Sequence, residues 1–291
     1  MSLATSAYKG ARDFYPADKR IQDYIFDVWR KTVEQYGYEA YDASVIEPIE
    51  LYLAKTSEEI VSEQTYVFED RGGRKVTLRP EMTPSVSRMV AGKRQELAYP
   101  LRWYSIPNVW RYERPQRGRL REHWQLNVDL FGEPGLPADH ELIMVADSIM
   151  QRFGATRDMY TILINSRKLV NAILHDVLGL DADTGIQVIR LVDRIKKMST
   201  TDFMTALTQL AGDKAPNIDQ IFRSESFADL PEQVRTHKAA QAVTQVIDLL
   251  GATGVTNVHF DVSLMRGFDY YTDIVFEMID TNPENNRSMF G

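Results

Sequence analysis

Five arginines lie within eleven residues of one segment, and they are the residues of this chain best suited to bind an anion. They are Arg111, Arg114, Arg117, Arg119 and Arg121. The planar guanidinium group binds phosphate and carboxylate through paired hydrogen bonds. Pro115, Gln116 and Gly118 favour a turn inside the run, so residues 110–132 are expected to form a strand, an arginine-rich turn and a second strand. This hairpin would hold guanidinium groups at fixed separations, which suits a polyphosphate.

Polar residues on the outgoing strand favour a ligand site over an exposed hairpin whose charges serve only solubility. Polar and apolar residues alternate from Gln125 to Leu130, which is the period of a half-buried strand. Gln125 and Asp129 have the same parity and are expected to face the same side of a sheet. An amide and a carboxylate on that face could hydrogen-bond to a small polar ligand, and burial would require such partners.

Two further clusters contain residue types that could do chemistry. Residues 78–83 read LRPEMT and end a strand before a helix, which leaves Glu81 in the connection. Glu81 could instead be a first-turn carboxylate that stabilises the helix dipole. Residues 266–272 read RGFDYYT, in which Arg266 and a glycine precede two tyrosines. A β-turn with tyrosines packed on either face of a sheet is the alternative there.

Composition excludes several classes of protein. A chain of 291 residues, 44% of them hydrophobic, is long enough for one large domain with a smaller one appended. It has no cysteine, no apolar run near roughly eighteen residues and no charged-then-apolar leader, so we expect a cytoplasmic protein without a membrane segment. The five histidines are scattered, and we expect no metal site. A net charge of −7 argues against nonspecific coating of nucleic acid.

The elements predicted around these clusters indicate an α+β fold. The apolar side of a first helix, which includes Ile21, Tyr24 and Val28, is expected to pack inward. Hydrophobic periods predict helices over 17–36, 83–92 and 137–153, strands over 64–69, 75–79, 160–164, 255–261 and 270–278, and only helices between 166 and 250. The expected architecture is an antiparallel sheet flanked by helices, with an all-helical insertion.

Together, LRPEMT, WRYERPQRGRLREHWQLNVD and RGFDYYT resemble histidyl-tRNA synthetase, a class II aminoacyl-tRNA synthetase. The resemblance begins at KGARDF, residues 9–14, and runs to the end of the chain. The arginine hairpin resembles motif 2 of that class. The helix that follows Pro16, with the extended segment that stops at Pro48, resembles motif 1, the dimer-forming element. RGFDYYT resembles a histidine-binding signature.

The resemblance implies a class II synthetase fold and a division of the chain. Residues 1–165 would be the first part of a catalytic core, 166–252 a helical insertion and 253–291 the second part of the core. The chain stops where the family continues into motif 3 and an anticodon-binding domain. It therefore resembles a catalytic-domain fragment, which we expect to bind histidine but to be impaired in activity.

The activity that the resemblance implies is ATP-dependent conversion of L-histidine to histidyl-adenylate, followed by transfer to the 3′ end of tRNA-His. ATP would arrive with Mg²⁺, and the enzyme would be a homodimer. The catalytic residues would be Arg111 and Arg266, both at the α-phosphate. Arg119 would hold the distal phosphates and Glu113 the adenine amino group.

The resemblance also implies a set of histidine-binding residues. Glu81 and Thr83 would bind the α-ammonium group, with Gln125 nearby, and Arg111 would bind the carboxylate. Asp129 and Tyr271 would contact the imidazole nitrogens, and Tyr270 would line the pocket. Asp129 is one methylene shorter than the glutamate of many bacterial members.

Two alternatives compete with a synthetase. A noncatalytic paralogue, the regulatory subunit of ATP phosphoribosyltransferase, keeps the fold and binds histidine as a signal. The synthetase is favoured by the RGFDYYT signature and by Arg111, Glu113, Arg119 and Arg266, because a regulator has no need of ATP-binding arginines. A dimeric scaffold without a ligand would need neither set of residues.

Overall fold

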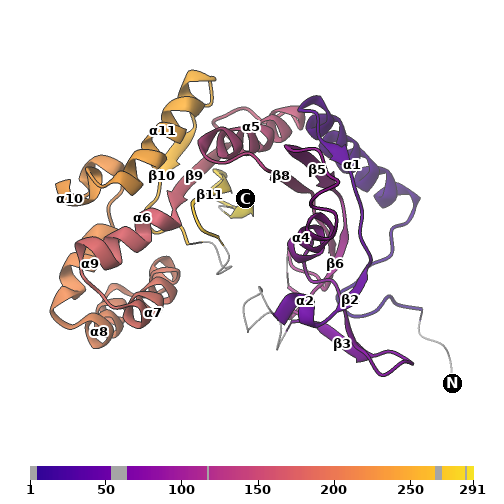
Figure 1. The fold of residues 1–291 in the computed structure, drawn as a ribbon, viewed down its shortest axis with the longest axis horizontal. Coiled ribbons are helices and arrows are strands. Elements are labelled where there is room, and N and C mark those ends of the chain that lie inside the picture. The colour runs from indigo at the N-terminus through magenta and orange to yellow at the C-terminus, as the bar shows by residue number, and fades with distance from the viewer. Residues whose placement is uncertain (1–4, 54–63, 117, 266–270, 286) are drawn as a thin grey trace. The chain divides into compact units, whose positions relative to one another are not determined.

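The computed structural model describes residues 5–53, 64–116, 118–265, 271–285 and 287–291. They divide into two compact bodies, with the boundary between Pro134 and Gly135 (Figure 1). Described residues up to Pro134 make up the first body, and those from Gly135 onward the second. The predicted segments 1–165, 166–252 and 253–291 stay a prediction.

The first body combines three helices with short strands in its described part. The helices are α1 (Pro16–Gln35), α2 (Glu50–Leu53) and α4 (Thr83–Gly92). The strands are β1 (Glu39–Ala40), β2 (Ile46–Pro48), β3 (Tyr66–Glu69), β4 (Lys75–Leu78), β5 (Leu101–Ser105), β6 (Asn108–Trp110), β7 (Glu122–Trp124) and β8 (Asn127–Phe131). They pair in the orders β1-β5-β8, β2-β4-β3 and β6-β7.

The second body consists of a sheet with the order β10-β9-β11-β12 and a run of helices. Its strands are β9 (Tyr160–Ser166), β10 (Val258–Phe260), β11 (Ile274–Asp280) and β12 (Ser288–Phe290). Its α-helices are α5 (Leu136–Arg152), α6 (Arg167–Asn171), α7 (Ala182–Val192), α8 (Thr200–Ala211), α9 (Ala215–Phe222), α10 (Glu232–Arg235) and α11 (Lys238–Ala252). Single turns of other helix types are η1 (Ala172–Val177), η2 (Ile195–Lys197), η3 (Gly212–Lys214) and η4 (Phe227–Asp229).

This arrangement confirms the predicted α+β class. Most strand pairs are antiparallel, and the exceptions among the described strands are β1 with β5 and β9 with β10. Residues 167–257 are described throughout and contain no strand, as the all-helical insertion requires. The helical segments and β9 bury a common core around Ile162 and Ile164, both fully buried. Apolar burial of this kind supplies most of the stability of such a body.

The predicted packing of α1 is wrong in its first half. Val28 and Val33 are buried, but Ile21 and Tyr24 expose 62% and 57% of their surface. The apolar stripe therefore extends beyond the surface that the first body offers for packing. Such an exposed continuation of a buried stripe is typical of an interaction surface.

The outgoing strand of the arginine hairpin is interrupted, contrary to the uninterrupted strand expected from Gln125 to Leu130. Its first part, β7, pairs with β6, and its second part, β8, pairs with β5. The break faces a matching break between β5 and β6, where Pro107 lacks an N–H group to donate. Gln125 lies in this break and its N–H donates to the Pro107 carbonyl over 3.3 Å. The parity argument that linked Gln125 to Asp129 therefore fails.

A buried carboxylate ties α5 to β9 in the second body. Asp147 is 1% exposed and accepts hydrogen bonds from Arg157, 3.0 Å away, and from the Tyr160 hydroxyl and the Gln151 amide. A buried carboxylate is tolerated because a cation and hydrogen-bond donors surround it.

We expect Asp147→Ala to lower the free energy of unfolding by about 3 kcal/mol, because it leaves a buried tyrosine hydroxyl and a guanidinium without their acceptor. Partial exposure of Arg157 keeps the loss from being larger. Urea unfolding followed by circular dichroism measures it. Tyr160→Phe, which removes one hydrogen bond, should lose about 1 kcal/mol. Equal losses in the two variants would contradict this description of the network.

Candidate functional site

The arginine hairpin has the predicted strand, turn and strand. β6 and β7 pair antiparallel, with Asn108 opposite Trp124 and Trp110 opposite Glu122. Pairing continues past β6, because the Arg111 N–H donates to the Arg121 carbonyl over 2.8 Å. Gln116 and Arg119 close the turn through two backbone hydrogen bonds of 3.0 and 2.9 Å. The two limbs therefore hold Arg111 and Arg119 on one rigid framework, while Arg117 lies outside the described residues.

Three residues predicted to bind ATP form one chain of charges. Glu113 accepts a hydrogen bond from Arg119 Nη1 over 3.2 Å, and its other carboxylate oxygen lies 4.0 Å from Arg111 Nη1. The Glu113 and Arg111 side chains expose 16% and 21% of their surface, whereas Arg119 exposes 66%. Ion pairs with such exposure contribute little to stability. Glu113 lies between the two guanidinium groups, and its negative charge offsets the repulsion between them.

Arg111 also connects the hairpin with the LRPEMT segment. Its Nε donates to the Pro80 carbonyl over 2.9 Å. The next residue, Glu81, is 4% exposed, and Thr83 is the first residue of α4. A predicted phosphate-binding arginine is thus hydrogen-bonded to the residue directly before Glu81, across about thirty positions of the chain.

Arg79 is a further site residue, which sequence reasoning missed. Its guanidinium is buried and donates to the carbonyls of Asn108 and Ala43, over 3.0 and 2.7 Å, and to Asp42 over 3.2 Å. Its own carbonyl accepts from the Trp110 N–H over 3.0 Å. Arg79 therefore joins the loop that carries Glu81 to the hairpin. Its place directly before Pro80 and Glu81, at the end of the strand predicted over 75–79, was the available signal.

Arg121 is buried and serves the framework, unlike the exposed arginines of the hairpin. Its Nη1 donates to the Tyr8 hydroxyl over 3.0 Å, its Nε to the Glu113 carbonyl over 3.1 Å, and its guanidinium lies 3.9 Å from the centre of the Tyr112 ring. Gly10 packs against it with φ of +89°, and a Cβ there would lie 2.7 Å from Arg121 Cγ. The glycine is therefore required both for its backbone conformation and for close approach.

A second polar contact of the first body involves Asp129, on β8. The Tyr41 hydroxyl donates to its Oδ2 over 2.9 Å. Burial raises the pKa of Asp129 to about 6, and the Tyr41 hydrogen bond offsets part of that rise. The carboxylate therefore carries its charge at neutral pH at a cost, which a further N–H donor from a ligand would reduce.

Other predicted residues are placed less completely. The Gln125 amide donates to Asn127 Oδ1 over 2.8 Å, so Gln125 and Asp129 each have a separate partner. Tyr271 belongs to the second body, just before β11. Arg266 and Tyr270 lie outside the described residues. In the part of the chain that the structure describes, no group of three or more His, Cys, Asp or Glu residues could hold a metal ion, and no helix is long and apolar enough to cross a membrane.

Solved structures with the same fold define the class of protein. A histidyl-tRNA synthetase from Nostoc sp. PCC 7120 superposes with a TM-score of 0.79 at 19% identity, and the match covers 95% of this chain and 65% of that one. An ATP phosphoribosyltransferase regulatory subunit/histidyl-tRNA synthetase from Bacillus halodurans superposes with a TM-score of 0.83 at 24% identity, over 99% and 76% of the two chains. Both likenesses concern the fold, which is that of a class II aminoacyl-tRNA synthetase.

The family is shown by sequence. Residues 10–286 match the family described as histidyl-tRNA synthetase. The chain is 42% identical to a histidine–tRNA ligase of Leptospira biflexa, over 99% of this chain and 67% of the relative. It is also 42% identical to that of Thermoplasma volcanium, over 94% and 64%. The chain belongs to the histidyl-tRNA synthetase family, and it spans about two thirds of the length of these relatives.

These relatives also favour the ligase over its noncatalytic paralogue. Relatives that are 36–42% identical, including one from Arabidopsis thaliana at 37%, are named histidine–tRNA ligases. The regulatory subunit is named for a structure that is 24% identical, where the likeness shows the fold alone.

The raised pKa of Asp129 predicts a pH-dependent affinity. If Asp129 accepts a ring N–H of the ligand, affinity is full above pH about 6 and falls as the carboxylate is protonated. Calorimetric titration should use a histidine analogue with a triazole ring, which does not protonate in this range. We expect affinity to fall about tenfold per pH unit below the pKa. Asp129→Asn should bind more weakly above the pKa of Asp129 and without this slope.

Protonation of Asp129 should raise the free energy of unfolding, whereas it lowers the affinity for the ligand. The pKa of Asp129 is higher folded than unfolded, so its contribution to stability is present below about pH 4 and lost as pH rises through about 6. Asp129→Asn should lack this decline in urea unfolding. A slope that persists in the variant would assign the titration to another group.

Proposed function

We propose that this chain activates L-histidine with ATP to form histidyl-adenylate and serves the transfer of the histidyl group to tRNA-His. The observation that carries the proposal is the position of Arg111, held by the Pro80 carbonyl at 2.9 Å beside Glu81 and directed toward Glu113. The guanidinium of Arg111 would thereby contribute to both the amino-acid site and the nucleotide site. Relatives named histidine–tRNA ligases, 42% identical to this chain, support the assignment.

Arg111 has the role of stabilising charge at the reacting phosphorus. The carboxylate of histidine attacks the α-phosphate, the bond from the α-phosphorus to the bridging oxygen breaks, and pyrophosphate leaves. Negative charge grows on the α-phosphate oxygens, and a guanidinium already fixed by a hydrogen bond stabilises it without reorganisation. Arg266 would be the second cation. Contacts of this kind are each worth about 3 to 4 kcal/mol in the transition state.

Glu113 and Arg119 would separate when the nucleotide binds. The adenine amino group would donate to Glu113, and the distal phosphates would accept from Arg119. Because the Glu113–Arg119 pair is partly exposed, its loss costs little. Mg²⁺ would enter with the phosphate oxygens and waters that it prefers as ligands.

Histidine would be selected through its polar atoms. Glu81 and Thr83 would bind the α-ammonium group, with Gln125 nearby. Asp129 and Tyr271 would bind the imidazole nitrogens, and Tyr270 would line the pocket. Selection by hydrogen bonds rejects an apolar amino acid of the same size strongly, because it leaves polar groups of the pocket unpaired.

The role of Arg111 predicts a loss of affinity for the activated intermediate. A sulfamoyl analogue of histidyl-adenylate places acceptor oxygens where those of the α-phosphate would be, so Arg111→Ala should weaken its binding about 10- to 100-fold in calorimetry. Arg114→Ala is the matched control, because Arg114 lies exposed on the same hairpin. Equal losses would indicate a diffuse effect of charge and contradict the assignment.

The activity itself is tested by histidine-dependent exchange between ATP and pyrophosphate in the full-length protein, and histidine binding without exchange would overturn it.

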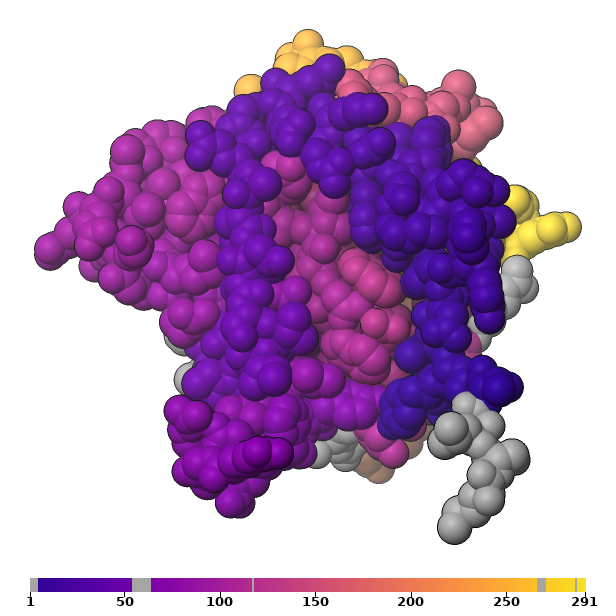
Figure 2. All heavy atoms as spheres, turned by 90° about the vertical axis from the view of Figure 1, so that its right-hand side faces the viewer, coloured from indigo at the N-terminus to yellow at the C-terminus, as the bar shows by residue number. Residues whose placement is uncertain are grey.

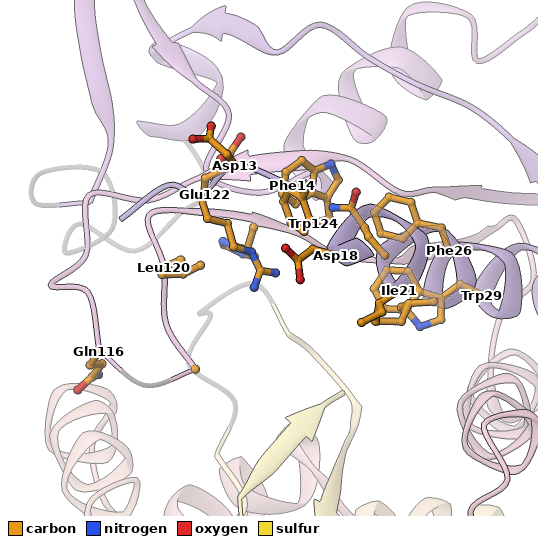
Figure 3. Close-up of a pocket in the computed structure, with 15 residues that line it drawn as sticks. Asp13, Phe14, Asp18, Ile21, Phe26, Trp29, Gln116, Leu120, Glu122 and Trp124 are labelled. Carbon is orange, nitrogen blue, oxygen red and sulfur yellow. The ribbon is translucent and has the colours of Figure 1, made fainter. Parts of the chain in front are cut away.

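We also propose that two copies associate through α1 and that the protein acts in the cytoplasm, where tRNA is charged. Figure 2 shows the indigo atoms of the N-terminal part of the chain at the surface. Beside α1 lies a groove of about 830 Å³, bordered by residues 12–14, the hairpin and β7 (Figure 3). Phe14 and Trp124 meet edge to face at its wall, 5.3 Å between centres, and Phe26 and Trp29 line it from α1. Apolar and aromatic linings favour a protein partner.

If α1 joins two copies, Ile21→Glu should shift the protein from dimer to monomer, because it places a charge on an apolar contact. Ile21 is exposed within one chain, so the fold should survive. Sedimentation velocity measures the change. Lys31→Glu, at another exposed position of α1, should leave the dimer intact. A monomeric unaltered protein, or a dimeric Ile21→Glu variant, would contradict the proposal.

A further inference from the structure

Tyr41 reaches across a strand of the first body to the carboxylate of Asp129. β5 lies between β1 and β8 in the sheet order, and its Trp103 is opposite Glu39 on one side and Asp129 on the other. Neighbouring strands lie about 4.8 Å apart, so β1 and β8 are separated by about 10 Å, which only a long side chain can span. Tyr41 directly follows β1, and its hydroxyl donates to Asp129 Oδ2 over 2.9 Å.

The position of Tyr41 is fixed both at its backbone and along its ring. The Tyr41 N–H donates to the Tyr104 carbonyl over 2.9 Å, which extends the pairing of β1 with β5 by one residue. The centres of the Tyr41 and Trp103 rings are 5.7 Å apart. Both rings pack against a buried cluster that includes Val86 and Val90 of α4. Because close packing restricts the ring, the hydroxyl is held at one place.

Tyr41 and Asp129 lie on one face of the sheet. Glu39, Trp103 and Asp129 form a row across the three strands and therefore share a face. Alternate residues of a strand point to the same side, so Tyr41 shares the face of Glu39. The helix that packs against the Tyr41 ring is α4, which begins at Thr83, one of the predicted ammonium-binding residues. Asp129 thus lies on the face of the first body against which the helix of Thr83 packs.

The carboxylate of Asp129 has an oxygen to offer to a ligand. Among the described residues, Tyr41 is the one hydrogen-bond donor to Asp129, and it occupies Oδ2. Both oxygens of a carboxylate accept hydrogen bonds, so Oδ1 remains for a donor from outside the protein. Asp129 is half-buried, and a ligand on this face can reach it.

The ionisable groups around this contact make Tyr41 a donor and Asp129 an acceptor. Burial raises the pKa of Tyr41 well above its usual value, and the charge of Asp129 raises it further, while Arg79 lowers it. Burial also raises the pKa of Asp129 to about 6, and the hydrogen bond from Tyr41 lowers it. α4 contributes apolar side chains here, those of Val86 and Val90. The Tyr41 hydroxyl therefore keeps its proton at neutral pH and favours the ionised carboxylate.

We propose that Tyr41 is a positioning residue, which donates to one oxygen of Asp129 so that the other meets a ring N–H of histidine. This proposal rests on the proposed function. A carboxylate whose orientation is fixed beforehand loses less conformational entropy when the ligand binds. With Asp129 held as an acceptor, the contact selects a ring that presents an N–H and rejects one that presents a lone pair there.

The test removes the hydroxyl and keeps the ring. Tyr41→Phe retains the contacts with Trp103 and α4, so the fold should survive. We expect the Kd of the full-length protein for histidine to rise about tenfold at about pH 8. For the triazole analogue, the midpoint of the fall in affinity should move upward by about one pH unit, because the carboxylate loses the hydrogen bond that lowers its pKa. The Kd for ATP should stay unchanged.

Two further variants distinguish positioning from a structural effect. Tyr104→Phe is the matched control, because it removes another tyrosine–carboxylate hydrogen bond of the same sheet, from Tyr104 to Glu34 over 2.7 Å. It should change neither the Kd for histidine nor the midpoint. In an Asp129→Asn background, Tyr41→Phe should change the Kd for histidine less than about twofold, because Tyr41 acts through the carboxylate.

The outcomes separate this proposal from the function on which it rests. Failure of the unaltered protein to bind histidine would overturn the proposed function, and the positioning role with it. If the unaltered protein binds histidine, an unchanged Kd or an unchanged midpoint in Tyr41→Phe would overturn the positioning role alone. So would an equal loss of affinity for ATP, an equal loss in Tyr104→Phe, or a full tenfold loss in the Asp129→Asn background.

Discussion

The site in the first body depends on the buried guanidinium of Arg79. A buried cation must find acceptors, and Arg79 takes two from carbonyls, of Ala43 and Asn108, and one from the carboxylate of Asp42. Asp42 is largely exposed, so the carbonyl dipoles hold the geometry while solvent screens the ion pair. Three chain segments are joined at one point, and Pro80 and Glu81 follow directly from it. The short strands of this body could not position those residues by themselves, since the ladders around them contain two to five residues.

The charged groups of the site are partnered before any ligand is present. Arg119 and Glu113 neutralise each other, Arg111 rests on a carbonyl, and Asp129 accepts a bond from Tyr41. The Glu113–Arg119 pair is partly exposed, so it contributes little to stability. The framework groups differ: Arg121 is enclosed by Tyr8, Tyr112 and the backbone, with Gly10 against its stem. Within one hairpin, burial therefore separates arginines available to an anion from an arginine that maintains the shape.

Sequence reasoning was accurate where local chemistry decides. The helices predicted over 17–36 and 83–92 are α1 and α4, and the strands predicted over 64–69 and 75–79 are β3 and β4, to within two residues at each end. The all-helical stretch and the α+β class were also correct. Errors arose where partners distant in the chain decide. A single strand was expected through Gln125, but Pro107 on the facing strand interrupts the ladder. Ile21 and Tyr24 were expected to be buried, but a helical period cannot show how much of a stripe finds a partner.

The sequence by itself determined the kind of chemistry. The residue types and their order are enough to identify the family, and they indicate which groups would bind a nucleotide and an amino acid. Only the tertiary structure decided which of these groups lie close together. It showed that the Arg111 side chain donates to the Pro80 carbonyl, that Arg79 joins the loop of Glu81 to the hairpin, and that burial raises the pKa of Asp129 to about 6. The physical reason is that side-chain types act through local propensity and chemistry, whereas distance, burial and hydrogen-bond partners are properties of segments brought together by folding.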